Sequence, residues 1–223
     1  MKIIHETILE IDLNKLANNF NYLKSKLKPD TKIIAVLKAY AYGHGDIAIA
    51  SYLEKLGAHA LWVADFEEGT RIRQSGIKIP IIIANPGTKS THKIIDNKLD
   101  VVIYNSELLH LYGKLDKEIK IHIKFDTGMN RYGFDASEVD ELVANLKKYP
   151  KLKIQSICSH LAASDNSEKD SFTNTQFQVF DKVSSSFSKM INQLIDRHLL
   201  NTNGVLRFPK KECEMVRLGI GLY

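Results

Sequence analysis

One lysine of the chain follows an apolar run directly and precedes a glycine-rich segment, in the stretch IIAVLKAYAYGHG at residues 33–45. If the run is a buried strand, the amine of Lys38 at its end is partly desolvated, which lowers its pKa and makes it a nucleophile toward an aldehyde. Lys38 is therefore a candidate for Schiff-base chemistry. A lone lysine has a simpler alternative, in which its side chain extends into solvent or pairs with a carboxylate. The hypothesis therefore depends on the residues that the fold places beside it.

Eight short apolar runs, each bounded by turn residues or by a helical pattern, predict the strands that would position such side chains. They cover residues 32–38, 61–65, 79–85, 100–104, 119–126, 154–160, 198–202 and 215–219. Their hydrophobicity is continuous rather than alternating, which is typical of parallel strands covered on both faces. Asp12 precedes apolar residues at spacings of three and four and is expected to cap a helix. Strands that alternate with helices predict an α/β fold, a (β/α)8 TIM barrel, with a doubly wound open sheet as the alternative.

In such barrels the functional residues gather at the carboxyl ends of the strands. Polar residues follow the predicted strands at these ends: Lys38, Tyr42, His44, Lys124, Asp126, Arg131, His160, Asn201, Thr202 and Arg217. After the seventh and eighth strands, where barrels frequently bind phosphate, the backbone N–H groups of Gly219 and Ile220 would suit a dianion. A Schiff-base lysine and a phosphate cup at one rim correspond to the two ends of pyridoxal 5'-phosphate, which we expect as the cofactor. Two residues keep plainer alternatives, Asp126 as a turn-forming residue and His44 as a loop histidine.

Five motifs of the chain resemble, in their order and approximate spacing, those of the bacterial alanine racemases. They are AVLKAYAYGHG, HIKFDTGMNRYGF, ICSHLAASDN, LLNTNGVLRFP and MVRLGIGLY, and they span essentially the whole chain. The resemblance implies an isomerase that uses pyridoxal phosphate to interconvert L-alanine and D-alanine, supplying D-alanine for the peptidoglycan of the cell wall. It also implies that residues 1–223 form the cofactor-binding barrel domain of an enzyme that is a homodimer at full length.

The resemblance assigns catalytic roles to Lys38, Arg131 and His160. Lys38 resembles the lysine that holds the cofactor and acts as the acid/base on one face of the substrate, and Tyr42 matches the tyrosine of the same motif. Lys124 corresponds to a lysine that is often carbamylated in this family. Its carbamate would orient Arg131, which resembles the arginine near the cofactor's phenolic oxygen and the substrate carboxylate.

The remaining matched residues would hold the other end of the cofactor. His160 resembles the histidine that contacts the cofactor-side arginine, here Arg217, which faces the pyridine nitrogen in the family. A fixed cation at that nitrogen discourages its protonation, so side reactions such as transamination would be suppressed. The phosphate cup of the family is matched by Asn201, Thr202, Gly219 and Ile220, with Thr202 in place of a frequent serine.

The chain departs from the family pattern in two respects. Tyr40 replaces an asparagine that is common in the lysine motif. Family members also continue into a β-rich carboxyl-terminal domain, whereas this chain stops at Tyr223. The family's second base is a tyrosine from the partner subunit's carboxyl-terminal domain, and it has no counterpart here. We therefore expect a barrel without its last helix and without the β domain, a fragment that binds the cofactor and, alone, at best exchanges the α proton on one face.

Composition predicts an ordinary cytoplasmic protein. The net charge is +5, but the basic residues are scattered among acidic ones, so we expect no nucleic-acid partner. The two cysteines lack metal-binding spacing, and reduced thiols agree with a cytoplasmic location. His5, Glu6 and Glu10 interrupt any apolar core of a signal peptide, and no run is long enough for a membrane span.

Two rival functions remain open at this point. One is a non-catalytic, single-domain barrel that binds pyridoxal phosphate for cofactor homeostasis, whose length agrees better with this chain. The other is a metal-dependent hydrolase, which would need histidines and carboxylates paired at strand ends; since His160 stands alone, we expect no metal. Alanine and serine differ by one hydroxyl, so the choice of substrate stays open. The oligomeric state also stays open.

Overall fold

The computed structural model of the protein describes residues 7–223 and closes eight parallel strands into a barrel. The strands are β1 (Lys32–Val36), β2 (Ala60–Val63), β3 (Ile81–Ile83), β4 (Asp100–Ile103), β5 (Ile119–Lys124), β6 (Leu152–Cys158), β7 (Asp196–His198) and β8 (Met215–Leu218). Each pairs with its neighbour in chain order, and β8 pairs with β1. The predicted (β/α)8 TIM barrel is therefore confirmed. Residues 1–6, which carry the His5 and Glu6 of the signal-peptide argument, lie outside the described residues.

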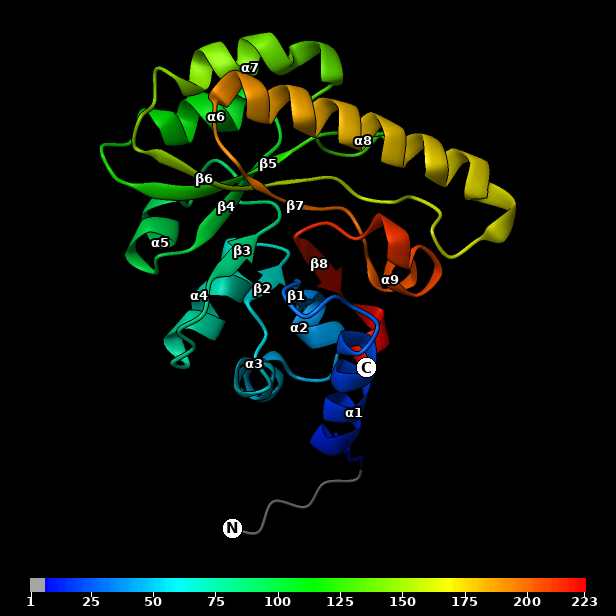
Figure 1. Ribbon diagram of the computed structural model, residues 1–223. Coiled ribbons are helices and arrows are strands. Elements are labelled where there is room, and N and C mark those ends of the chain that lie inside the picture. The colour runs from blue at the N-terminus through cyan, green and yellow to red at the C-terminus, as the bar shows by residue number, and fades with distance from the viewer. Residues whose placement is uncertain (1–6) are drawn as a thin grey trace.

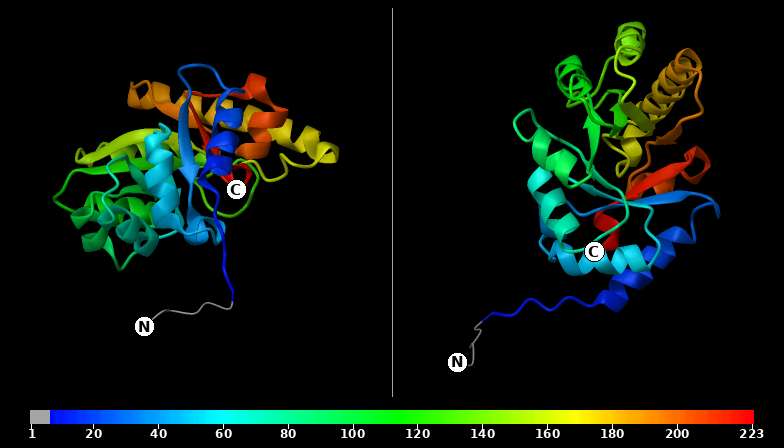
Figure 2. Two further views of the ribbon diagram at one scale, coloured as in Figure 1. Left: turned by 90° about the horizontal axis from the view of Figure 1, so that it is seen from below. Right: turned by 90° about the vertical axis from the view of Figure 1, so that its left-hand side faces the viewer.

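Helices connect the strands and surround them on the outside (Figures 1 and 2). They are α1 (Leu13–Lys24), α2 (Lys38–Tyr42), α3 (Asp46–Lys55), α4 (Phe66–Gln74), α5 (Thr91–Asp96), α6 (Ser106–Gly113), α7 (Val139–Leu146), α8 (Asp170–Ile191) and α9 (Thr202–Arg207), with 3-10 turns η1 (Ala136–Glu138), η2 (Ser167–Lys169), η3 (Pro209–Lys211) and η4 (Ile220–Leu222). Asp12 caps α1 as predicted, because its carboxylate accepts from the N–H groups of Asn14 and Lys15.

The core has two layers because alternate residues of each strand face opposite sides. The outer layer is apolar and packs the strands against the helices. Inside the barrel, a smaller apolar cluster is formed by Ile34, Ala60, Ile82, Val102 and Met215. These residues come from β1 to β4 and from β8, so only part of the barrel's interior is filled by apolar side chains.

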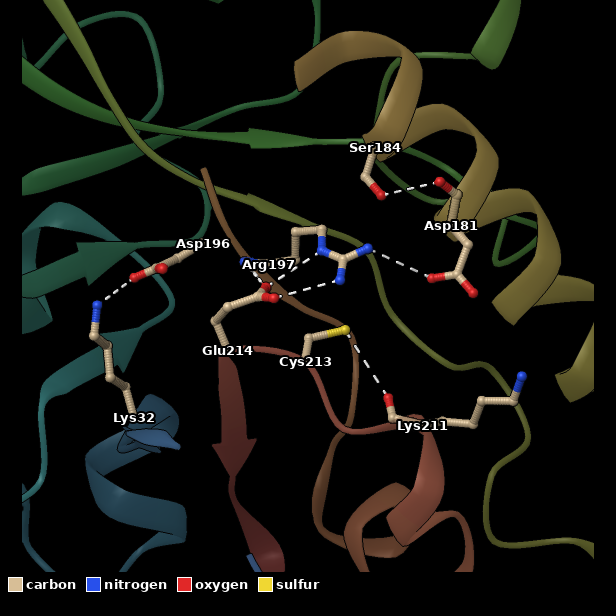
Figure 3. A network of polar contacts seen from close by, with 8 residues as sticks. All are labelled: Lys32, Asp181, Ser184, Asp196, Arg197, Lys211, Cys213 and Glu214. Atoms are coloured by element: carbon tan, nitrogen blue, oxygen red, sulfur yellow. Dashed lines mark hydrogen bonds and ion pairs between the residues drawn. The ribbon is translucent and has the colours of Figure 1, made fainter. Parts of the chain in front are cut away.

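A network of charged side chains ties β7 to its neighbours (Figure 3). Arg197 on β7 donates from its backbone N–H to Glu214 at 2.9 Å and from Nε to the same carboxylate at 3.3 Å. Its guanidinium also lies 3.7 Å from the carboxylate of Asp181 on α8. Asp196 pairs with Lys32 on β1. The short strand β7 is therefore held by contacts to helix α8, to the segment before β8 and to β1.

Candidate active site at the carboxyl ends of the strands

A cavity of about 450 Å³ opens at the carboxyl ends of the strands. The ten residues that the family resemblance assigns to the site all line it: Lys38, Tyr42, Lys124, Arg131, His160, Asn201, Thr202, Arg217, Gly219 and Ile220. Four of these carry basic side chains on long stems. The acidic residue among the cavity's described lining, Asp65, uses its carboxylate to cap α4. The cavity is therefore strongly cationic and suited to an anionic ligand.

Lys38 is presented by an unusual turn. The four residues that follow it have positive φ angles of 53° to 55°, so α2 is a left-handed turn built without glycine. Such a conformation costs roughly 1–2 kcal/mol per residue and must be held by its surroundings. Glu68 of α4 provides part of that support, since its carboxylate accepts from the N–H of Ala39 at 2.7 Å and from that of Ala64 at 2.8 Å. Glu68 fixes the backbone immediately after Lys38, although nothing in the sequence singled it out.

The two lysines of the cavity differ in burial. Lys38 is exposed, so the desolvation that we expected at the end of its strand is not found there. Lys124, the last residue of β5, is instead half-buried, and its pKa is lowered to about 8 by burial and by the cations Arg217 and Arg131. A substantial share of Lys124 amines is therefore neutral near pH 8, as a reaction with carbon dioxide requires.

Arg217 is buried at the floor of the cavity. Its guanidinium donates to the backbone oxygens of His198, at 3.0 Å, and of Leu199, at 3.2 Å, and also to that of Ser159. It donates further to the ring nitrogens of His198 and His160. Burial lowers the pKa of this guanidinium, yet an arginine keeps its proton in proteins. No carboxylate among residues 7–223 forms an ion pair with it, so the cation is oriented by carbonyl and imidazole acceptors.

His160 lies just after β6, and its imidazole contacts the guanidinium of Arg217 on β8. Its Nδ1 lies 3.2 Å from the guanidinium nitrogen, and its pKa is lowered to about 2 by burial and by Arg217. Its backbone is fixed by Gln176 of α8, whose amide donates to the His160 carbonyl at 3.0 Å and accepts from the N–H of Ala162 at 2.9 Å. The imidazole is therefore neutral and held as a hydrogen-bonding group.

The neighbouring part of the cavity is formed by residues that follow β7 and β8. Thr202, the first residue of α9, accepts a hydrogen bond from the N–H of Gly219 at 3.0 Å. Asn201 caps α9 by accepting from the N–H of Gly204 at 2.8 Å. A Cβ atom at Gly219 would lie 2.8 Å from the hydroxyl oxygen of Tyr42, so glycine allows this tyrosine to approach the backbone. The predicted strand over residues 198–202 ends earlier, at His198, which places Asn201 and Thr202 at a helix start.

Several other predicted positions have supporting roles. Asp126 accepts from the N–H groups of Gly128 and Asn130, which confirms its interpretation as a turn residue. His44 stacks on Tyr223 and contacts the backbone oxygen of Ala41, outside the cavity lining. Tyr40 is exposed beneath Arg71 and also lies outside it. Within residues 7–223 there is no group of three metal-ligating side chains, and none of the helices is both long and apolar enough to cross a membrane.

The residues of the cavity fit pyridoxal phosphate. The cofactor carries an aldehyde, a pyridine nitrogen and a phosphate dianion, and the cavity offers an amine at Lys38, a buried cation at Arg217 and a hydroxyl beside a backbone N–H at Thr202 and Gly219. These groups follow or belong to β1, β7 and β8, three neighbouring strands of the closed barrel, so they share one part of its rim.

A closed parallel barrel whose strand ends surround one cationic cavity defines a (β/α)8 protein with a cavity at its rim that suits an anionic ligand. The profile of the family described as "Alanine racemase, N-terminal domain" matches residues 11–223. The chain belongs to the alanine racemase family, of which it represents the N-terminal barrel.

Individual relatives agree with this assignment. Alanine racemase 1 of Oceanobacillus iheyensis is 33% identical over 221 residues, covering 96% of this chain and 58% of the relative. The solved structure of alanine racemase from Clostridium difficile 630 superposes with a TM-score of 0.93 at 31% identity, over 100% of this chain and 59% of that one. The alanine racemase of Bartonella henselae, described with covalently bound pyridoxal phosphate, gives a TM-score of 0.85 at 26% identity over 96% and 59% of the two chains. This chain thus spans somewhat more than half the length of these relatives.

Proposed function

We propose that residues 1–223 form one domain, the pyridoxal-phosphate-binding barrel of an alanine racemase. The observation that carries the proposal is the position of three groups around one cavity: the amine of Lys38, the buried guanidinium of Arg217, and the hydroxyl of Thr202 next to the N–H of Gly219. They would receive the aldehyde, the pyridine nitrogen and the phosphate of the cofactor. When bound there, the cofactor supplies an electron sink that acidifies the α C–H bond of an amino acid.

The residues of the chain would do the rest. Lys38 Nζ would hold the cofactor and move the α proton on one face of the substrate, and Tyr42 would close the cavity beside Gly219. Arg131, on the loop after β5, would bind the substrate carboxylate. A carbamate on Lys124 would pair with that guanidinium and fix its direction. His160 and Arg217 would hold the pyridine side, with Asn201 and Ile220 completing the phosphate cup.

The reaction that we propose for the whole protein is the interconversion of L-alanine and D-alanine, as a supply of D-alanine for peptidoglycan. Its relatives carry the name alanine racemase, and the cationic cavity suits an amino acid carboxylate as well as a phosphate. The homodimer and the cytoplasmic location expected from the sequence stay predictions, as does the absence of a nucleic-acid partner.

Cofactor binding is tested by adding pyridoxal phosphate, reducing with borohydride and mapping the modified lysine by mass spectrometry. We expect one dominant modification, on Lys38, at stoichiometric cofactor. Lys38→Arg should remove it, and pyridoxal without its phosphate should label Lys38 far less at the same concentration, because it leaves the Thr202–Gly219 side without a partner. Equal labelling of many lysines by both compounds would contradict the proposal.

A second experiment separates catalysis from mere cofactor binding. The loaded chain is incubated with L-alanine or D-alanine in D2O, and loss of the α proton is followed by NMR. We expect exchange of one enantiomer faster than of the other, because Lys38 reaches one face only. A cofactor-homeostasis barrel would bind the cofactor and exchange neither. Repeating the incubation with L-serine and D-serine tests the substrate range.

A further inference from the structure

Five polar side chains form a continuous series inside the barrel, one from each of five consecutive strands. They are Asp100 on β4, His122 on β5, Ser156 on β6, His198 on β7 and Arg217 on β8. All are buried, with at most 6% of each residue exposed. They occupy the part of the barrel interior that the apolar cluster around Ile34 does not fill. Only Arg217 lines the cavity, so the other four lie beneath the proposed cofactor site.

The links between them are hydrogen bonds. Arg217 donates to Nδ1 of His198, and Nε2 of His198 lies 2.8 Å from the hydroxyl oxygen of Ser156. The same hydroxyl oxygen lies 2.6 Å from Nδ1 of His122. Nε2 of His122 lies 3.5 Å from the carboxylate of Asp100, which is the longest link. The series therefore runs from the floor of the cavity to the start of β4.

The direction of every bond follows from the chemistry of the ends. A guanidinium has no acceptor, so Nδ1 of His198 is bare and its proton is on Nε2, where it is donated to Ser156. The serine hydroxyl, already accepting, donates its own proton to Nδ1 of His122. His122 then carries its proton on Nε2 and donates it to Asp100, since a carboxylate only accepts. The cation and the anion thus lie at opposite ends of a chain in which all donors point the same way.

We infer that Asp100, His122, Ser156 and His198 form a hydrogen-bond chain of single polarity, and that Ser156 is a positioning residue for Arg217. The chain locks His198 as the tautomer that accepts from the guanidinium, and this keeps the guanidinium aimed at the floor of the cavity. The existence of the chain is independent of the proposed function. Its use, holding the cation that faces a bound pyridine nitrogen, rests on that function.

The first test is histidine-selective 15N NMR of the full chain at pH 8 without added cofactor. We expect His122 and His198 each to carry a single proton, on Nε2, with a bare Nδ1. A proton on Nδ1 of either ring, or a doubly protonated His122, would overturn the inference, because the serine proton would then lack an acceptor.

Variants test how the chain acts on Arg217. In Ser156→Ala, His198 loses its acceptor, and we expect the Arg217 side-chain N–H protons to exchange with solvent about tenfold faster, as for the loss of one hydrogen bond. Ser156→Thr keeps the hydroxyl and should restore slow exchange. Ser184→Ala is the matched control, because Ser184 on α8 is buried too but its hydroxyl contacts only the Asp181 carbonyl, at 3.4 Å (Figure 3). Equal exchange in the two alanine variants would contradict a positioning role.

Asp100→Leu separates the two ends of the chain. His198 should stay protonated on Nε2, because Arg217 still fixes it, and so should His122, because the Ser156 hydroxyl still donates to its Nδ1. A change of tautomer at His198 would mean that the order is imposed from Asp100, contrary to the inference. Neither NMR readout involves pyridoxal phosphate, so failed borohydride labelling of Lys38 would reject the cofactor proposal and leave the chain standing, and the reverse also holds.

Discussion

Arg217 on β8 donates from its guanidinium to Nδ1 of His160, which follows β6, over 3.2 Å. Since an arginine cannot accept, Nδ1 of His160 is bare and the neutral ring carries its proton on Nε2, on the other side of the imidazole. The same cation and the burial of the ring lower the pKa of His160 to about 2. Arg217 therefore determines the protonation state of His160 and, through His198, the tautomers of the histidines inside the barrel.

The buried histidines predict a loss of stability in acid. The pKa of His160 is about 2 against an ordinary 6.5, and burial with Arg217 holds the pKa of His198 well below that value too. Below pH 6.5 the unfolded chain therefore binds more protons than the folded one, so the free energy of unfolding falls as the pH falls. Each histidine contributes about 1.4 kcal/mol per pH unit. Urea unfolding between pH 7 and 5 measures the slope of the unfolding free energy against pH. His160→Asn should remove the contribution of one proton from this slope. His92→Asn, at an exposed position, is the control and should leave the slope unchanged.

Lys124 predicts a rise of stability with pH at higher pH, with the same sign as for the histidines. Its pKa is about 8 in the folded chain and about 10.5 in the unfolded one, so between these values the unfolded chain holds the extra proton and stability rises with pH. Lys124→Met should be more stable than the parent by about 1–3 kcal/mol at pH 7, a difference that vanishes near pH 10.5. Urea unfolding in CO2-free buffer gives the comparison. Lys120→Met, at an exposed position of the same strand, should show no such difference.

The same lowered pKa predicts where carbamylation occurs. With 13C-labelled carbon dioxide at constant pressure, a slowly exchanging carbamate signal should grow from pH 7 to pH 8.5 as the Lys124 amine loses its proton. The signal should be absent in Lys124→Met and present in Lys120→Met. A carbamate that persists in Lys124→Met would place the modification elsewhere.

Glu68 is predicted to hold the left-handed turn after Lys38. In Glu68→Gln one carboxylate oxygen becomes an NH2 group, which cannot accept from either of the N–H groups of Ala39 and Ala64. We expect a loss of stability of about 1–3 kcal/mol, since one of the two amides is left without its acceptor. Hydrogen exchange at residues 39–41 should become faster, and pyridoxal phosphate should label Lys38 more weakly. Glu67→Gln, at the exposed neighbouring position, is the control.

Gly219 and Tyr42 are predicted to be coupled. A Cβ at position 219 would approach the Tyr42 hydroxyl oxygen to 2.8 Å, so Gly219→Ala should displace this ring. In a Tyr42→Phe background the obstructing oxygen is gone, and the same alanine should cost less. A double-mutant cycle on unfolding free energy should give a coupling of about 0.5–2 kcal/mol. Additive effects would show that the side chain and the glycine do not meet.

The sequence by itself determined the order of the strands and the residues at their carboxyl ends. Continuous apolar runs identify parallel strands, and closing them into a barrel brings every strand's carboxyl end to one rim. For this reason Lys38, after the first strand, and Arg217, on the eighth, could be assigned to one site from the sequence. The identity of each residue is read directly from the sequence, whereas the barrel fold explains why residues from distant parts of the chain lie close together.

Other features were decided only by the tertiary structure. Four residues without glycine adopt positive φ after Lys38 against their intrinsic preference, and a carboxylate from α4 provides part of the support for this turn. Lys124 is partly buried whereas Lys38 is exposed, because the burial of a side chain depends on which other residues cover the end of its strand. Ser156 and Asp100 look in sequence like ordinary polar residues of strands. Which of them meet inside the barrel depends on strand register and on contacts between distant residues, and neither is encoded in a local pattern.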